Sequence, residues 1–144
     1  MTNVKELEAF MDLFFKVHRE MDHEKLISLY SFPLVSIGTS RHEFNEYLSA
    51  SAYKDNQRSD YQKVIAMRIE EILPRYISTE SDNAWVATRF SVWIKDSDKN
   101  DIVMHCRLTL ILKKIDQQWL IVHQHYSVPD HMADKQEAYP GQIV

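Results

Sequence analysis

The sequence has one cysteine, two glycines and four prolines among its 144 residues. The single Cys106 can form neither an intramolecular disulfide nor a cysteine zinc cluster. So little glycine and proline excludes collagen-like and low-complexity chains. Residues 1–5 also lack the basic and then apolar pattern of a secretory leader. These shortages predict a protein of the reducing cytoplasm.

Long apolar runs and a cationic excess are also missing. No stretch approaches the roughly 18 apolar residues that a membrane helix needs. Seventeen Lys and Arg against 21 Asp and Glu give a net charge of 17 − 21 = −4, so no broad basic surface can neutralise phosphates. We therefore expect no membrane and no nucleic-acid partner. What the chain does contain is 44% hydrophobic and 11% aromatic residues, enough for one domain over residues 1–144 with a polar tail from 129.

The first part of the chain has helical periodicity. Apolar residues recur at steps of three and four, which predicts a helix over residues 4–21 that Asn3 caps. Asp22 is positioned to cap a second, shorter helix, which Pro33 ends because the residue before a proline avoids helical angles. The expected buried positions of these two helices are Val4, Leu7, Met11, Phe14, Phe15, Met21, Leu26, Ile27 and Tyr30.

A short strand over 34–37 and a third helix are predicted next. Ser40 and Glu43 have the spacing of a capping box, which favours a helix from Ser40 to about Ala52. Its buried stripe would be Phe44, Tyr47 and Leu48. Residues 54–60 are polar and predict a loop.

The second half has the texture of strands joined by hairpins. Apolar and β-branched runs between clusters of turn residues predict four antiparallel strands. Their expected ranges are 61–72, 84–94, 102–113 and 119–128. Pro74 cannot donate to a ladder, so it should mark an edge, a bulge or a strand end. Helices followed by a meander predict an α+β fold whose helices cover one face of a curved sheet.

Strict alternation along these strands separates two faces. One face is apolar, and its members are Val86, Thr88, Phe90, Val92, Ile94, Met104, Cys106, Leu108, Leu110, Leu112, Leu120, Val122, Gln124 and Tyr126. This face should lie against the helices and enclose an apolar ligand pocket with a few polar anchors. The candidate ligand-binding residues are Tyr30, Cys106, Gln124, Tyr126 and Phe14.

The opposite face mixes aromatic and polar side chains. Its candidate members are Arg89, Arg107, Thr109, Trp119, His123, His125 and Ser127. Such a surface is typical of a subunit interface, so we predict a homodimer formed through the sheet; a binding-site lining and a solvated surface are the alternatives. The two arginines on this face could clamp a carboxylate or pair with Glu70.

The cysteine and the histidines raise two further possibilities, a reactive thiol and a zinc site. Cys106 has His105 and Arg107 as neighbours, and a nearby cation activates a thiol. Those neighbours point to the other face, however, so a buried inert thiol is expected. His123 and His125 share one side of a strand, and His105 could complete a zinc site, but two histidines at this spacing are weak evidence. We expect no metal and no cofactor, and no catalytic residue is assigned.

The segment from Arg107 to Pro129 resembles the closing hairpin of the SnoaL-like branch of the nuclear transport factor 2-like superfamily. It contains an Arg-x-Thr strand, a Trp after the turn and a His-x-His-x-Ser-x-Pro ending. It is also similar to the association domain of calcium/calmodulin-dependent kinase II. Asp82-Asn83-Ala84-Trp85-Val86 resembles a turn and strand of these relatives, with Ser81 replacing the usual glycine.

This resemblance implies a cone-shaped α+β fold, often dimeric through the sheet, with a pocket inside the cone. It does not fix an activity. The residues of ketosteroid isomerase are missing, since its base would fall at Ser36-Ile37-Gly38, its tyrosine near Phe14 or Phe15, and its acid near Leu108 to Leu110. The kinase-hub arginines would fall at Leu110 and Tyr126. A small-molecule-binding homodimer is the first prediction; the alternatives are an isomerase, cyclase or dehydratase that uses a pocket His, Arg or Tyr, and an oligomerisation module with a vestigial pocket.

Overall fold

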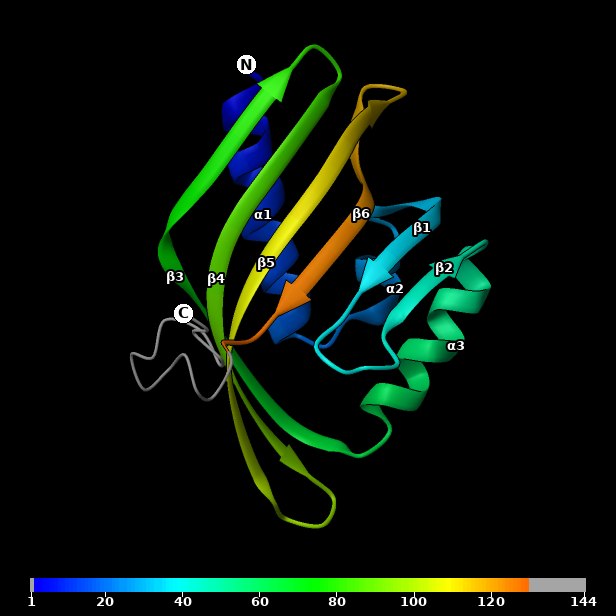
Figure 1. Ribbon diagram of the computed structural model, residues 1–144, viewed down its shortest axis with the longest axis vertical. Helices are drawn as coiled ribbons and strands as arrows, with labels where there is room; N and C mark the ends of the chain where they lie inside the picture. The colour runs from blue at the N-terminus through cyan, green and yellow to red at the C-terminus, as the bar shows by residue number, and fades with distance from the viewer. Residues whose placement is uncertain (1, 130–144) are drawn as a thin grey trace, which may run out of the picture.

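Six strands form one curved mixed sheet in the computed structural model, which describes residues 2–129 (Figure 1). The helices are Asn3–Arg19 (α1), His23–Ile27 (α2) and Ala50–Tyr61 (α3). The strands are Tyr30–Ile37 (β1), Phe44–Tyr47 (β2), Val64–Glu80 (β3), Asn83–Asp96 (β4), Asp101–Ile115 (β5) and Gln118–Ser127 (β6). The strand order is β2-β1-β6-β5-β4-β3, and only the β1–β6 pair is parallel. The predicted α+β fold with a curved, mostly antiparallel sheet is confirmed.

Helix α1 lies across the inner face of the sheet and packs against β3 (Figure 1). It begins one residue earlier than predicted, because the cap is Thr2, whose hydroxyl accepts from the Lys5 backbone amide at 3.3 Å. Asn3 is therefore wrong as the cap. Its amide instead donates to the carbonyl of Ser81 at 3.1 Å and ties the start of the helix to the β3–β4 turn.

The second helix is shorter than expected. Asp22 caps α2 as predicted, accepting from the Lys25 amide at 3.1 Å. The helix ends at Ile27, and Tyr30 already belongs to β1, so Pro33 lies inside this strand and ends no helix. No helix of the described residues is long and apolar enough to span a bilayer.

The predicted third helix over 40–52 is wrong. Ser40 and Glu43 do make a reciprocal contact, in which the Glu43 carboxylate accepts from the Ser40 amide at 3.3 Å, but this contact closes the turn before β2. Leu48, expected in the buried stripe, is 73% exposed. The true helix α3 is capped by Ser49 and occupies the segment that was predicted as a loop.

Strands β3 to β6 form the predicted meander. Pro74 lies in a bulge of β3, between the pairs Ile72–Arg89 and Tyr76–Ala87, and β3 is an edge strand. Pro74 was predicted to mark an edge, a bulge or a strand end, and the structure confirms the first two. Along β4 and β5 the apolar alternation is also confirmed, because residues from Val86 to Leu112 with the predicted parity are buried or half-buried.

Trp119 lies on the opposite face from the one predicted. Opposite β5, Ile111 pairs with His123 while Leu112 pairs with Ile121, so β6 carries one extra residue at Val122. This bulge reverses the parity of the earlier part of the strand. Trp119 is 7% exposed on the inner face, so its assignment to the polar outer face is wrong.

The buried Trp119 belongs to a polar anchor between α1 and the sheet. Its indole donates to Oε2 of Glu6 at 2.9 Å, and Nζ of Lys114 lies 3.0 Å from the same oxygen. The hydrogen bond from Lys114, followed by that from Trp119, lowers the pKa of Glu6. The anchor fixes the end of the sheet that is remote from α3.

Candidate ligand-binding site

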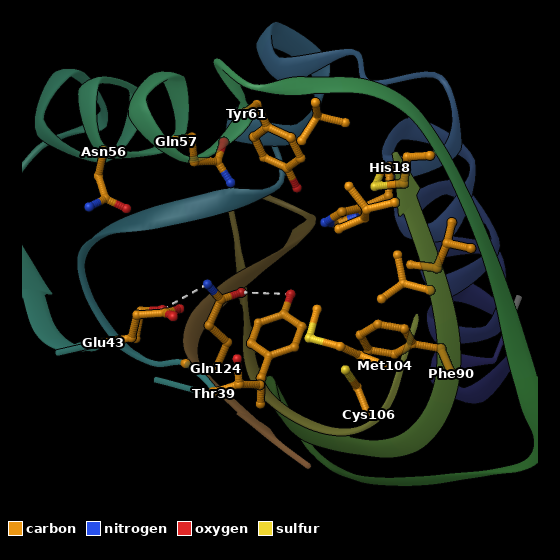
Figure 2. Close-up of a pocket in the computed structure, with 18 of the residues that line it drawn as sticks. His18, Thr39, Glu43, Asn56, Gln57, Tyr61, Phe90, Met104, Cys106 and Gln124 are labelled. Atoms are coloured by element: carbon orange, nitrogen blue, oxygen red, sulfur yellow. Dashed lines mark hydrogen bonds between the residues drawn. The ribbon is translucent and has the colours of Figure 1, made fainter. Parts of the chain in front are cut away.

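A cavity of about 280 Å³ lies between the inner face of the sheet and helices α1 and α3 (Figure 2). Its apolar walls are formed by Phe14, Val64, Met67, Ile69, Phe90, Val92, Ile94 and Met104. Its polar lining contains His18, Ser36, Thr39, Glu43, Asn45, Asn56, Gln57 and Gln124, with Tyr47, Tyr53, Tyr61 and Tyr126. None of the lining residues in the described chain is a lysine or an arginine. Small-molecule sites typically combine apolar and aromatic walls with polar groups that orient the ligand, and this cavity has both.

The structure brings most of the predicted ligand-binding residues to this cavity. Phe14, Cys106, Gln124 and Tyr126 line it. Tyr30 is 5% exposed and lies behind the lining, where its hydroxyl donates to Oε1 of Gln124 at 2.6 Å. Their contact with a ligand stays a prediction.

Gln124 is the centre of a buried hydrogen-bond network. Its carbonyl oxygen accepts from Tyr30 and, at 3.4 Å, from Tyr126. Its amide donates at 2.9 Å to Oγ of Ser36 and at 2.9 Å to the hydroxyl of Tyr53. All four hydrogen-bonding positions of the glutamine are thereby used within the protein. Gln124 therefore positions the tyrosines and has no spare capacity for a ligand.

Two tyrosines of this network and the Cys106 thiol are held neutral by burial. Burial raises the pKa values of Tyr30 and Tyr126 well above the ordinary range of tyrosine. Burial also raises the pKa of the Cys106 thiol. A protonated, buried thiol is a poor nucleophile, so the structure favours the inert role for Cys106.

His18 is the cavity residue that sequence reasoning missed. The ring lies on α1, and Figure 2 shows it directed into the cavity. Its Nδ1 lies 2.7 Å from the carbonyl oxygen of Phe14, one helical turn earlier, and the two rings are in contact with centroids 4.4 Å apart. Burial is the main cause that lowers the pKa of His18 to about 4. The imidazole is therefore neutral at pH 7, with its proton on Nδ1 and a lone pair on Nε2.

Helix α3 contributes a second polar group that the sequence did not predict. Gln57 is 7% exposed, and its amide donates to the hydroxyl of Tyr53 at 3.1 Å. Within residues 2–129, its buried Oε1 has no hydrogen-bond partner. Tyr53, Gln57 and Tyr61 are spaced by four residues, which places all three on one side of α3 and in the cavity lining.

The rim of the cavity carries the one carboxylate of its described lining. Glu43 is exposed and folds back over Gly38, where an added Cβ would lie 1.8 Å from Oε2 and 2.6 Å from the Glu43 Cβ. Only glycine fits at this position, because the backbone and side chain of Glu43 would both have to move for a larger residue. The turn before β2 therefore packs tightly against Gly38 in the cavity lining.

The remaining predicted polar residues gather on the outer face of the sheet. Register pairs place His125 opposite Thr109, and Arg107 opposite both Arg89 and Ser127. Arg107 donates to Oγ of Ser127 at 3.2 Å. In the described chain neither arginine forms an ion pair, so the alternative of a pair with Glu70 is absent there.

The three histidines that suggested a zinc site do not converge. The residue opposite His125 is Thr109, so His105 lies four residues, or roughly 13 Å, further along β5. Nδ1 of His105 hydrogen-bonds Ser91 at 2.8 Å, and Nδ1 of His123 lies 2.9 Å from the carbonyl of Val35. Among the described residues, no three His, Cys, Asp or Glu side chains are arranged to hold a metal ion.

Comparison with protein families supports the fold. The sequence model of a family described as a SnoaL-like domain matches residues 7–131. No curated protein matches the chain.

Solved structures with the same fold are similar over most of the chain. A nuclear transport factor 2-like superfamily protein from Salmonella enterica is 16% identical, with a TM-score of 0.76 and coverage of 97% of this chain and 96% of that one. A candidate calcium/calmodulin-dependent protein kinase II association domain from Xanthomonas campestris is 18% identical, with a TM-score of 0.72 and 91% coverage of both chains. A ketosteroid isomerase-like protein from Erwinia carotovora is 15% identical, with a TM-score of 0.72 and coverage of 88% and 95%. At these identities the likeness establishes the fold alone.

Proposed function

The chain belongs to the SnoaL-like domain family, and we propose that it binds a small, uncharged and largely apolar molecule in the cavity between α1, α3 and the sheet. The observation that carries this proposal is the composition of the cavity. Apolar side chains and four tyrosine rings together form about half of its lining, and the described lining holds no lysine or arginine. An anion buried there would lose its hydration without gaining a counter-charge, at a cost of several kcal/mol.

The cavity lacks a base suited to proton transfer, so we propose a binding function and not acid–base catalysis. The ketosteroid isomerase-like name of one similar structure suggests proton transfer, which needs a base whose pKa lies near the working pH. Ser36 and Gly38 line the cavity without a carboxylate, and the carboxylate of Glu43 is exposed at the rim. With a pKa of about 4, His18 is a much weaker base than a free imidazole.

A larger side chain that fills the cavity is expected to weaken the binding of an apolar probe. Naphthalene is a suitable uncharged probe, and its binding is measured by ligand-observed magnetic resonance. Cys106→Phe places a ring in the cavity floor and should weaken naphthalene binding at least tenfold, whereas Cys106→Ala, which leaves the space open, should retain it. Met104→Trp is a second filling variant in case the first does not fold by circular dichroism. Naphthalene binding that survives filling, or that is absent from the wild type, would contradict the proposed function.

We also propose that two copies associate through the outer face of the sheet. Apolar and aromatic side chains form a continuous row across four strands, because Trp85 pairs with Ile111, Ile111 with His123 and His123 with Val35. Trp85, Ile111 and Val35 are 46%, 41% and 39% exposed, and a contiguous exposed apolar row is typical of an interaction surface, whereas single exposed apolar residues are not.

Charge complementarity favours a second copy as the occupant of this face. Arg89 and Arg107 lie side by side and form no ion pair within the described chain. Glu70 lies on the same face, opposite Ser91, which is two residues beyond Arg89 on β4. In a two-fold dimer the same patch meets itself, so Glu70 of one copy can neutralise the arginines of the other.

Charging the outer face is expected to convert the dimer to a monomer. The double variant Trp85→Asp with Ile111→Asp should halve the mass measured by light scattering after size exclusion, because four buried carboxylates would face one another across the two-fold axis. Leu48→Asp is the matched control, since Leu48 is 73% exposed and lies outside the row. A wild-type protein that is monomeric at 100 μM would refute the dimer.

A further inference from the structure

We infer that the occupant of the cavity carries a neutral hydroxyl group, or an equivalent N–H, which donates a hydrogen bond to Nε2 of His18. This inference rests on the proposed function and adds a chemical class to it. It makes His18 a specificity-determining residue that selects hydroxylated, largely apolar molecules against those of the same shape without a donor.

The first support is the fixed orientation of the His18 ring. The Phe14 carbonyl can only accept, so Nδ1 at 2.7 Å must be the donor of that bond. The neutral ring then presents a lone pair on Nε2. Within residues 2–129 the hydrogen bond identified for this ring is that of Nδ1, and Figure 2 shows the ring projecting into the cavity from the α1 side. A ligand donor that enters the cavity can therefore form a hydrogen bond with Nε2.

The second support is Gln57. This side chain is more than nine-tenths buried, it lines the cavity, and its Oε1 is an acceptor without a partner in the described chain. His18 Nε2 and Gln57 Oε1 are thus two acceptors at the α1–α3 end of the cavity. Gln124 cannot supply the missing donors, because its amide hydrogens are engaged by Ser36 and Tyr53.

The two acceptors, His18 Nε2 and Gln57 Oε1, favour some classes of ligand over others. A carboxylate or phosphate would bring further acceptors and a negative charge toward the lone pair of His18, which is repulsive. A plain hydrocarbon would fill the cavity but leave both acceptors without hydrogen bonds, at a cost in affinity. An alcohol or a phenol satisfies an acceptor and still buries an apolar body.

Matched two-ring probes test the inference. 2-Naphthol and 2-methoxynaphthalene share their ring system, and only the former can donate a hydrogen bond. We expect the wild type to bind 2-naphthol at least tenfold more tightly than 2-methoxynaphthalene. His18→Phe should remove this preference while naphthalene still binds, and Gln57→Leu should reduce it. Gln118→Leu, a change at the exposed start of β6 and outside the cavity lining, should leave the preference intact.

A direct readout covers the case in which the His18 variant does not fold. In wild-type protein labelled with nitrogen-15 histidine, the Nε2 resonance of His18 should shift on addition of 2-naphthol and stay in place with 2-methoxynaphthalene. If naphthalene binds but 2-naphthol shows no preference and no such shift, the inference on the hydroxyl is wrong and the proposed function stands. If neither naphthalene nor 2-naphthol binds, the proposed function itself fails.

Discussion

Gln124→Leu is expected to lower the free energy of unfolding by about 3 kcal/mol. Leucine fills nearly the same space but removes every hydrogen bond of the glutamine. The hydroxyl of Tyr30 loses the acceptor at 2.6 Å, and Ser36 and Tyr53 each lose a donor at 2.9 Å. Buried polar groups without partners cost about 1–3 kcal/mol each, which outweighs the gain from burying a more apolar side chain.

Urea denaturation measures this loss, and the same strand provides the control. Gln118 is the first residue of β6 and is exposed, so Gln118→Leu should change the free energy of unfolding by less than about 0.5 kcal/mol. A Gln124→Leu protein as stable as the wild type would show that the network contributes no net stability. The cavity floor would then be held by apolar packing alone.

The strands, and the face of the sheet to which each side chain points, were predictable wherever apolar and polar residues alternate without interruption. Val86 to Ile94 and Met104 to Leu112 alternate strictly, and burying one side of such a strand fixes its register. The bulge at Val122 is different, because one extra residue reverses the parity of Trp119 without leaving any trace in the apolar pattern. Nothing local distinguishes a strand with such an insertion from a regular one.

The third helix failed for a related reason. The Glu43 carboxylate accepts from the Ser40 amide in this turn as it would in a helical capping box, whereas the Glu43 amide donates to the Ser40 carbonyl oxygen and not to its hydroxyl. The spacing of the two residues therefore does not specify the element that follows. The true helix α3 is polar because it lies at the rim of a cavity and buries few apolar residues. Tertiary placement, which a local pattern cannot report, decided between the two segments.

The sequence predicted the apolar and sheet-borne part of the candidate site but not its polar residues His18 and Gln57. Phe14, Cys106, Gln124 and Tyr126 followed from helix and strand faces, and the cavity exists where these faces meet. A signal for His18 was present as well, because it lies four residues after Phe14 on the buried side of α1. Gln57 had no such signal, since it belongs to the segment that was predicted as a loop.

Acidification from pH 7 to pH 4 is expected to remove as much as about 3 kcal/mol of stability through His18. The ordinary pKa of 6.5 applies to the unfolded chain, and burial lowers the pKa in the folded protein to about 4, with a smaller contribution from repulsion by His23. Between these values the unfolded state binds the extra proton, so stability rises with pH. The contribution is complete above about pH 6.5, is lost as the pH falls toward 4, and does not change below that.

A comparison of the wild type with two variants isolates the contribution of His18 to the pH dependence of stability. Carboxylates such as Glu6, whose pKa is lowered by Lys114, also reduce stability in acid, but they do so in all three proteins. His18→Phe and His18→Gln both remove the titration, so each should have a smaller difference in unfolding free energy between pH 7 and pH 4, whatever its absolute stability. If the variants lose as much stability as the wild type, His18 is already charged or solvated in the folded state. A charged ring carries a proton on Nε2 and cannot accept a hydrogen bond from a ligand hydroxyl, and a solvated ring already accepts one from water, so the same measurement bears on the selectivity of the cavity.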